Sequence, residues 1–329
     1  MARWRTSHIL AAGIGLLLFA AALVALHHIL AEVHLADVRK AISGLSPWKI
    51  GLAILSAAGS YLMLTGYDVL ALRQLGKSIP YIRAAFAAFL SYAISHTVGL
   101  SVLTGGSVRY RIYSPIGLTT TEIVRLTSIC ALTFGLAVTF ILSLALILEP
   151  AAVGRIDQLP AGLNLALGIV MLAALVAYIA WIASASRKIA FRGWELELPG
   201  LRATLMQFVI GACDLLLAST ALYVLLPQQA DIGFFTFTGL FIAAISLSFL
   251  SHIPGGVGVL EAMILLALPD IPPDQLLASL LVFRVVYYLL PFTIAATLMG
   301  GLEAARNSGS MTAVATSLEP LVRTLAPLV

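Results

Sequence analysis

Long apolar stretches, separated by short polar segments, dominate the pattern of residues along this chain. A helix that crosses a lipid bilayer needs about 20 predominantly apolar residues. Continuous stretches of this kind occupy residues 8–30, 50–72, 118–148, 161–186, 202–226 and 275–301. The pattern therefore predicts an all-α integral membrane protein with six full spans.

Two further stretches, 82–112 and 232–269, are apolar but interrupted by glycine and proline. The interruptions are Gly99, Gly105 and Gly106 in the first stretch and Pro254, Gly255, Gly256 and Gly258 in the second. Irregular backbone at membrane depth survives only where protein or a water-filled cavity surrounds it. Each stretch is therefore predicted to be two half-helices around a break, a discontinuous crossing or a re-entrant hairpin, which gives about eight hydrophobic segments in all.

The distribution of basic residues favours re-entrant hairpins. Basic clusters, which mark cytoplasmic segments, are Arg3 and Arg5, then Arg73, Lys77 and Arg83, then Arg187, Lys188, Arg192 and Arg202. The segments 149–160, 227–231 and 270–274 hold a single basic residue, Arg155. The basic clusters and the segments poor in basic residues fall on opposite faces of the membrane if 82–112 enters from the cytoplasmic side and 232–269 from outside. Both termini are then cytoplasmic. The segment 31–49 disagrees, since its basic residues would then lie outside.

This layout contains an internal repeat. The order span, span, hairpin, span occurs in residues 8–148 and again in 161–301. An odd number of crossings in each unit makes the two copies inverted, and inverted repeats with broken helices indicate a substrate site near the middle of the membrane. We therefore predict one polytopic membrane domain, residues 1–303, and assign 304–329 to a cytoplasmic tail or to the start of a further span.

Composition supports the membrane assignment and excludes other classes. Apolar residues make up 60% of the chain and charged residues 10%, whereas a soluble domain has about 45–50% and about 25%. The net charge of +4 is small and its basic residues are clustered between spans, which suits lipid headgroups and not nucleic acid. No metalloprotease, P-loop or dinucleotide motif is present, so we expect no cofactor, no metal and no enzyme active site in these residues.

A few charged residues fall inside the apolar stretches. Asp214 lies near the centre of 202–226, where a charge costs about 2.5–3.5 kcal/mol on insertion scales and marks a functional site by default. Arg284, within the last span, would pair with Asp214 or Glu261. The alternative for Asp214 is a structural pair or a protonated carboxyl packed in the bundle, and for Arg284 it is a structural ion pair. Glu261 either lines the cavity or reaches the outer surface. Asp68 stands five residues before Arg73, so it is either a cavity group or part of a solvated helix end.

The segment from Thr104 to Arg111 is the most informative stretch. Glycines allow backbone N–H groups to approach a ligand closely, and a helix that starts there directs its positive end at an anion. The predicted anion site consists of Gly105, Gly106, Ser107, Arg109 and Arg111. The alternative is an ordinary cytoplasmic loop. His96 and His252 are either proton relays or hydrogen-bonded helix ends, and we favour the helix ends. Neither Ser-His pair is interpreted as a catalytic dyad, because no third group orients it.

Two motifs resemble a known family. The stretch from Ser95 to Gly117 is similar to the lysylphosphatidylglycerol synthase transmembrane region. It contains Gly105-Gly106-Ser107-Val108-Arg109-Tyr110-Arg111-Ile112-Tyr113, followed by Gly117-Leu118. Ser251-His252-Ile253-Pro254-Gly255-Gly256-Val257-Gly258-Val259-Leu260-Glu261 resembles the second signature of that family. The family includes the flippase domain of the multiple peptide resistance factor and stand-alone YbhN-like membrane proteins.

The resemblance implies a bacterial cytoplasmic (inner) membrane protein that flips a phospholipid between leaflets, with lysylphosphatidylglycerol as the expected cargo. Arg109, with Arg111, would hold the lipid phosphate, and Asp68, Asp214 and Glu261 a cationic headgroup. The expected partners are a membrane phospholipid, a second copy of the chain, and a fused or separate aminoacyl-lipid synthase. Three alternatives stay open, namely the membrane platform of a phosphatidylglycerol lysyltransferase, an ion-coupled small-solute transporter, and a scaffold.

Overall fold

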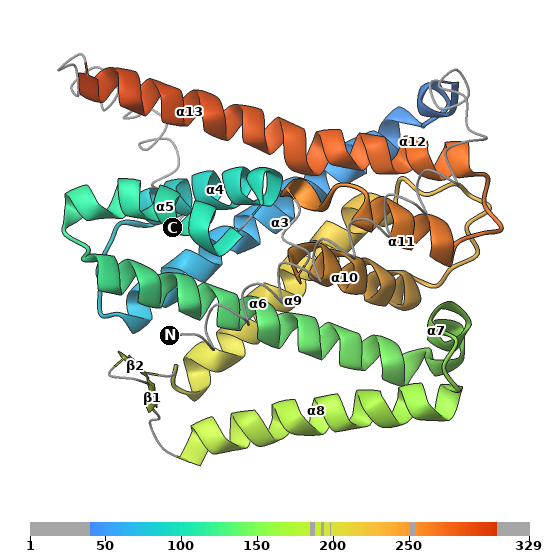
Figure 1. The fold of residues 1–329 in the computed structure, drawn as a ribbon, viewed down its shortest axis with the longest axis horizontal. Helices are drawn as coiled ribbons and strands as arrows, with labels where there is room; N and C mark the ends of the chain where they lie inside the picture. Colours follow the sequence, from blue (N-terminus) through green and yellow to red (C-terminus); the bar gives the residue numbers. More distant parts are fainter. Residues whose placement is uncertain are drawn as a thin grey trace, which may run out of the picture.

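The computed structural model describes residues 40–99, 101–184, 188–191, 194–197, 199–250 and 254–307 (Figure 1). In these residues, five helical segments are long and apolar enough to cross a membrane. They are α3 (Pro47–Gln74), α6 (Thr120–Leu148), α8 (Ala161–Ser184), α9 (Leu201–Tyr223) and the segment Pro273–Leu302. The predicted spans in these places are confirmed, and the predicted span 8–30 lies outside the described residues. This is a multi-pass helical membrane protein.

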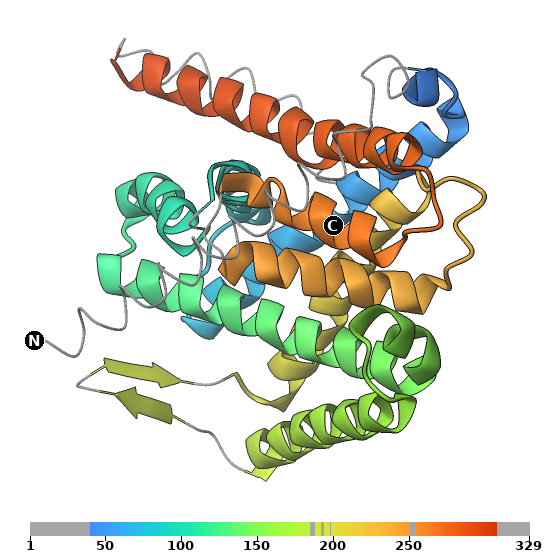
Figure 2. The ribbon, with the colours of Figure 1, turned by 45° about the vertical axis from the view of Figure 1, so that its right-hand side comes forward.

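The two interrupted stretches form helical hairpins. The first pairs α4 (Tyr81–Val98) with α5 (Ser101–Tyr113), and the second pairs α10 (Phe234–Leu250) with α11 (Val259–Ala267). They enter from opposite ends of the long helices, and their tips meet in the middle of the molecule (Figures 1 and 2). The predicted pair of re-entrant hairpins is therefore present.

The break in the first hairpin is shorter than predicted. Helix α4 ends at Gly99, whose φ of 84° suits glycine alone, and α5 has begun by Ser101. Gly105 and Gly106 lie inside α5, which corrects the prediction that they interrupt the helix. Gly105 has a packing role, because a Cβ there would stand 3.5 Å from Ser95 Cβ of α4. The glycine lets the two arms of the hairpin approach closely.

The second hairpin breaks where predicted. The turn η2 (Pro254–Gly256) and Gly258 separate α10 from α11, and the glycines at 255, 256 and 258 have φ of 61°, 59° and 87°. Left-handed backbone costs other residues roughly 1–2 kcal/mol each. The run of glycines therefore fixes the position of this tip.

The last span contains a local irregularity. Between α12 (Pro273–Phe283) and α13 (Leu290–Asn307), the chain forms a π-helical segment, η3 (Arg284–Leu289). Such widened turns are frequent at functional sites. Here the segment turns Tyr287 and Tyr288 toward the tips of both hairpins, since both side chains reach the space between them.

The connections lie at two opposite ends of the molecule (Figure 1). One end carries the turn after α3, the short helix η1 (Ser114–Ile116) and the strand pair β1 (Lys188–Phe191) and β2 (Trp194–Glu197). The other carries α7 (Pro150–Asp157) and the segments 224–233 and 268–272. The basic cluster at 73–83 thus shares one end with Lys188 and Arg202, the described members of the later cluster, as predicted. Which end faces the cytoplasm stays a prediction.

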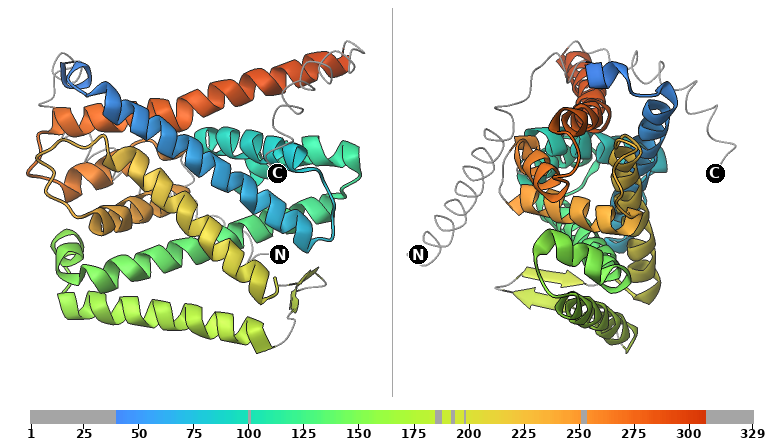
Figure 3. Two further views of the ribbon diagram at one scale, coloured as in Figure 1. Left: turned by 180° about the vertical axis from the view of Figure 1, so that it is seen from behind. Right: turned by 90° about the vertical axis from the view of Figure 1, so that its right-hand side faces the viewer.

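Helices α3 and α9 cross the centre of the bundle side by side (Figure 3, left). Glycines allow this close packing, since Cβ atoms at Gly59 and Gly66 would meet Leu217 and Ile210 of α9 at 3.2 and 3.0 Å. Helices α3 to α6 of the first repeat unit and α9 to α13 of the second follow the same order of elements in opposite directions (Figure 1). The repeat boundaries 8–148 and 161–301 stay a prediction.

Candidate functional site

A cavity of about 370 Å³ lies between the tips of the two hairpins. Its walls come from α3, α4, α5, α6, α9, α10, η2 and η3, so both repeat units contribute. The polar and ionisable side chains on the wall are Tyr67, Tyr92, Ser95, His96, Arg109, Thr127, Cys130, Asp214, Ser248, Tyr287 and Tyr288. A cavity is therefore present between the two broken helices, and its use as a substrate site near the middle of the membrane stays a prediction.

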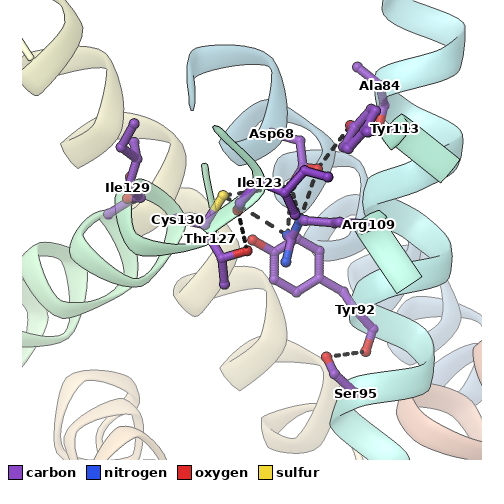
Figure 4. A network of polar contacts seen from close by, with 11 residues as sticks. Asp68, Ala84, Tyr92, Ser95, Arg109, Tyr113, Ile123, Thr127, Ile129 and Cys130 are labelled. Atoms are coloured by element: carbon purple, nitrogen blue, oxygen red, sulfur yellow. Dashed lines mark hydrogen bonds and ion pairs between the residues drawn. The ribbon is translucent and has the colours of Figure 1, made fainter. Parts of the chain in front are cut away.

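The first charged cluster is an ion pair between α3 and α5 (Figure 4). Arg109 Nη2 donates to Asp68 Oδ1 at 2.7 Å, and Arg109 Nε donates to Asp68 Oδ2 at 3.1 Å. The two side chains are 3% and 0% exposed. Asp68 is therefore a buried partner of Arg109, and its interpretation as part of a solvated helix end is wrong.

Further groups complete this cluster. Tyr113 donates its hydroxyl to Asp68 Oδ2 at 3.0 Å, and the Cys130 thiol lies 3.6 Å from Asp68 Oδ1. The guanidinium carbon of Arg109 lies 4.8 Å from the ring centre of Tyr92, which is a cation–π contact. Asp68 thus stands behind Arg109, and Arg109 is the member of the ion pair that lines the cavity.

Asp214 forms the second cluster, held by hydroxyl groups. Ser60 donates to Asp214 Oδ1 at 2.5 Å, and Tyr67 donates to Asp214 Oδ2 at 3.1 Å. The Tyr287 hydroxyl lies 2.8 Å from Ser60 Oγ. No ion pair of the described residues includes Asp214, so its predicted pairing with Arg284 is not observed.

Arg284 pairs with Glu261, the other partner that the sequence suggested. Arg284 Nε donates to Glu261 Oε1 at 2.7 Å, and the guanidinium also donates to the carbonyl oxygens of Gly255 and Gly256. Glu261 Oε2 accepts from the Gly258 N–H at 2.8 Å. Neither charged side chain lines the cavity. This ion pair therefore stabilises the tip of the second hairpin from outside the cavity.

Several predicted site residues lie elsewhere. Ser107 and Arg111 are exposed on α5 and, with Gly106, do not line the cavity. Ser107 donates back to Leu103 O within its own helix, at 2.7 Å. Because α5 begins before Gly105, the glycines do not form the helix start that was expected to bind an anion. Of the predicted anion site, only Arg109 reaches the cavity.

His96 also differs from its prediction. It lines the cavity, and its Nδ1 atom has no hydrogen-bond partner among the residues that the structure describes. Its ring is stacked on that of Tyr287, with ring centres 6.3 Å apart and planes 12° from parallel. The interpretation as a hydrogen-bonded helix end is wrong for His96, and His252 lies outside the described residues.

Sequence reasoning missed the hydroxyl side chains around Asp214. Ser56, Ser60 and Tyr67 recur at intervals of four and seven residues within the apolar stretch 50–72. Side chains at these intervals lie on one face of a helix. The signal of a polar helix face was therefore present. No comparable signal identified Tyr287, whose direction depends on the π-helical segment.

Apolar side chains extend the cavity to the outside of the bundle. Val102 and Leu103, at the start of α5, line the cavity and are 63% and 66% exposed. Phe249, at the end of α10, lines it and is 38% exposed. The cavity therefore extends to exposed apolar side chains at the surface of the bundle, between the two hairpin tips.

Comparison with known proteins identifies similar chains. Residues 10–295 match the family model described as the lysylphosphatidylglycerol synthase TM region. An uncharacterized protein of Synechocystis, slr0712, is 31% identical over 93% of this chain and 96% of its own length. The inner membrane protein YbhN of Escherichia coli is 30% identical over 75% of this chain and 81% of its own. The phosphatidylglycerol lysyltransferase of Staphylococcus haemolyticus is 26% identical over 84% of this chain but 32% of the enzyme.

Proposed function

The chain belongs to the lysylphosphatidylglycerol synthase transmembrane family, and we propose that it translocates a phospholipid between the leaflets of the bacterial cytoplasmic membrane. The observation that carries the proposal is the cavity between the opposed hairpin tips. A lipid crossing a bilayer must move a polar headgroup through the apolar centre while its acyl chains stay in lipid. A polar cavity that extends to exposed apolar side chains at the surface of the bundle provides such a route.

Arg109 is the proposed contact for the lipid phosphate. Its bonds to Asp68 use Nε and Nη2, so Nη1 is not part of that pair. Gly105 leaves room beside Nη1, because a Cβ there would stand only 3.4 Å away. Arginine binds phosphate through charge-assisted hydrogen bonds. Asp68 keeps the guanidinium in place without using its whole donor set.

Asp214 is the proposed contact for a cationic headgroup. It is 4% exposed and lines the cavity, together with the rings of Tyr67, Tyr92 and Tyr287. An ammonium group gains from a carboxylate in surroundings of low dielectric constant and from aromatic faces. Since Asp68 and Glu261 already have guanidinium partners, Asp214 is the carboxylate that a headgroup would pair with.

The proposed cargo follows from this combination of charges. A phosphate contact and an ammonium contact in one cavity suit an aminoacylated phosphatidylglycerol, and the staphylococcal relatives are phosphatidylglycerol lysyltransferases. The chain spans about a third of the length of those enzymes. A fused or separate synthase as partner and a homodimer stay proposals.

Reconstitution in vesicles tests the function. Purified protein is inserted into liposomes that contain lysylphosphatidylglycerol, and a membrane-impermeant amine reagent labels the outer leaflet. We expect labelling to rise from the outer-leaflet share to the whole pool of lysyl-lipid, and to stay at the outer-leaflet share in protein-free vesicles. Unchanged labelling would refute translocation and favour the platform alternative. Uptake of a water-soluble amino acid in place of lipid would favour the solute transporter.

A further inference from the structure

We propose that Asp214 binds either a proton or the ammonium group of the lipid, and that the protein therefore exchanges a cationic lipid for a proton. The inference rests on the proposed function and adds its energy source. It depends on the hydrogen-bond partners of Asp214, which differ in kind from those of the other buried acids.

The partners of Asp214 accept both protonation states. Ser60 and Tyr67 are hydroxyl groups, and a hydroxyl can donate to a carboxylate or accept from a carboxylic acid. A guanidinium has only donors. Asp68 and Glu261, which face Arg109 and Arg284, must therefore stay ionised. Among these three acids, Asp214 alone has surroundings that suit a carboxylic acid as well as a carboxylate.

Charge balance makes the two ligands exclusive. A carboxylate at 4% exposure, without a cation beside it, carries a large desolvation penalty. A bound proton removes the charge, and a bound ammonium group compensates it. If a proton and an ammonium group were bound together, the charge of the ammonium group would be uncompensated. If neither were bound, the charge of the carboxylate would be uncompensated. The empty cavity therefore favours protonated Asp214, and the loaded cavity favours ionised Asp214.

Other titratable groups surround Asp214 in the cavity. Those that line the cavity are Tyr67 of α3, Tyr92 and His96 of α4, Arg109 of α5, Cys130 of α6, and Tyr287 and Tyr288 of η3. Tyr61 of α3 is not on the cavity wall but interacts electrostatically with Asp214. The tyrosines and the cysteine are neutral when protonated, and Arg109 is neutralised by Asp68. His96 is the remaining group that could carry a proton to Asp214, since it reaches the same cavity.

The transport cycle balances protons and charge. On the alkaline side, the lipid ammonium group displaces the proton of Asp214, which passes to water. On the acid side, a proton from water reaches Asp214 as the ammonium group leaves. One proton therefore moves down its gradient for each lipid that moves the other way. A cationic lipid would accumulate in the leaflet that faces the acid side.

A gradient experiment in vesicles tests the direction. Lysylphosphatidylglycerol is first shown to exchange between leaflets at equal pH, and a gradient of about one pH unit is then imposed with the membrane potential clamped. We expect enrichment in the acid-side leaflet, up to roughly tenfold at equilibrium for one proton per lipid. Exchange that ignores the pH gradient, or follows a sodium gradient instead, would overturn the inference and leave the proposed function standing. Absence of exchange at equal pH would refute the proposed function itself.

Proton release from detergent-solubilised protein tests the assignment to Asp214. Lysylphosphatidylglycerol is added to weakly buffered protein at a series of pH values, and an indicator dye follows the proton. We expect lysylphosphatidylglycerol to release up to one proton per protein. Phosphatidylglycerol should release none, and Asp214→Asn should abolish the release. Asp270→Asn, the same change at an exposed carboxyl, is expected to release protons like the native protein. No release at any pH, or full release by Asp214→Asn, would contradict the assignment.

Discussion

The ion pair between Asp68 and Arg109 gives the sharpest prediction about stability. Removing either charge leaves its partner buried without compensation, since the two side chains are 0% and 3% exposed. Two well-formed charge-assisted hydrogen bonds are lost, at 2.7 and 3.1 Å, and each is worth about 1.5–3 kcal/mol. We therefore expect Asp68→Asn or Arg109→Gln to cost about 3–5 kcal/mol, the range for breaking a buried pair.

The double variant distinguishes an ion pair from two independent side chains. With both charges removed, no uncompensated charge is left, so Asp68→Asn with Arg109→Gln should cost less than the sum of the single changes. The interaction energy between contacting residues is about 0.5–3 kcal/mol. Reversible unfolding of the protein in mixed micelles with increasing SDS, followed by circular dichroism, gives the four free energies.

The chain offers a matched control in the ion pair of Lys77 and Glu122. Its nitrogen–oxygen distance is also 2.7 Å, but the side chains are 32% and 24% exposed. Exposed pairs contribute about 0–1 kcal/mol, so Lys77→Met should have little effect. Equal losses at the two ion pairs, or additive effects of Asp68→Asn and Arg109→Gln, would refute the reasoning.

The remaining predictions concern helix packing. Gly211→Ala should destabilise the protein by about 1–3 kcal/mol, because its Cβ would lie 2.6 Å from another Cβ on α6. As a control in the same unfolding assay, Gly135→Ala should be neutral or stabilising, because nothing lies within 4 Å of its Cβ. Gly256→Ala should cost roughly 1–2 kcal/mol for its φ of 59°, and more for the contact at 2.5 Å with α10; wild-type stability would contradict the turn. In a chain that lacks the native cysteines, the double variant Ser95→Cys with Gly105→Cys should form a disulfide, because the two Cβ atoms would be 3.5 Å apart. Two free thiols under oxidising conditions would contradict the helical position of Gly105.

Much of this fold follows from the length of the apolar segments. The spans 50–72, 118–148, 161–186, 202–226 and 275–301 correspond to helices because bilayer thickness fixes their length. The break at Pro254–Gly256 was predictable, since proline and successive glycines disfavour a continuous helix. The prediction of a break at Gly105 and Gly106 was wrong, because glycine also allows close helix packing and a single sequence does not separate the two roles.

The site was harder to predict than the spans. Of the charged residues that stand out in apolar stretches, Arg109 and Asp214 line the cavity, and Asp68 and Arg284 each form an ion pair outside it. Which acid pairs with which arginine depends on how the helices cross. The sequence therefore left two partners open for Arg284, namely Asp214 and Glu261. Ser60 and Tyr287 are ordinary residues in sequence, and only the fold brings them to Asp214. The short strands β1 and β2 lie in a polar connection that hydropathy does not describe.

Filling the cavity tests the central claim most directly. Ala131 lines the cavity on α6 and is exposed, so Ala131→Trp can add volume there without disturbing the core. Ala174→Trp makes the same change on α8, at an exposed position that does not line the cavity. In liposomes that contain lysylphosphatidylglycerol, the account predicts that Ala131→Trp slows leaflet exchange to nearly the protein-free rate while Ala174→Trp matches the native protein. Equal exchange by both variants would contradict a route through this cavity.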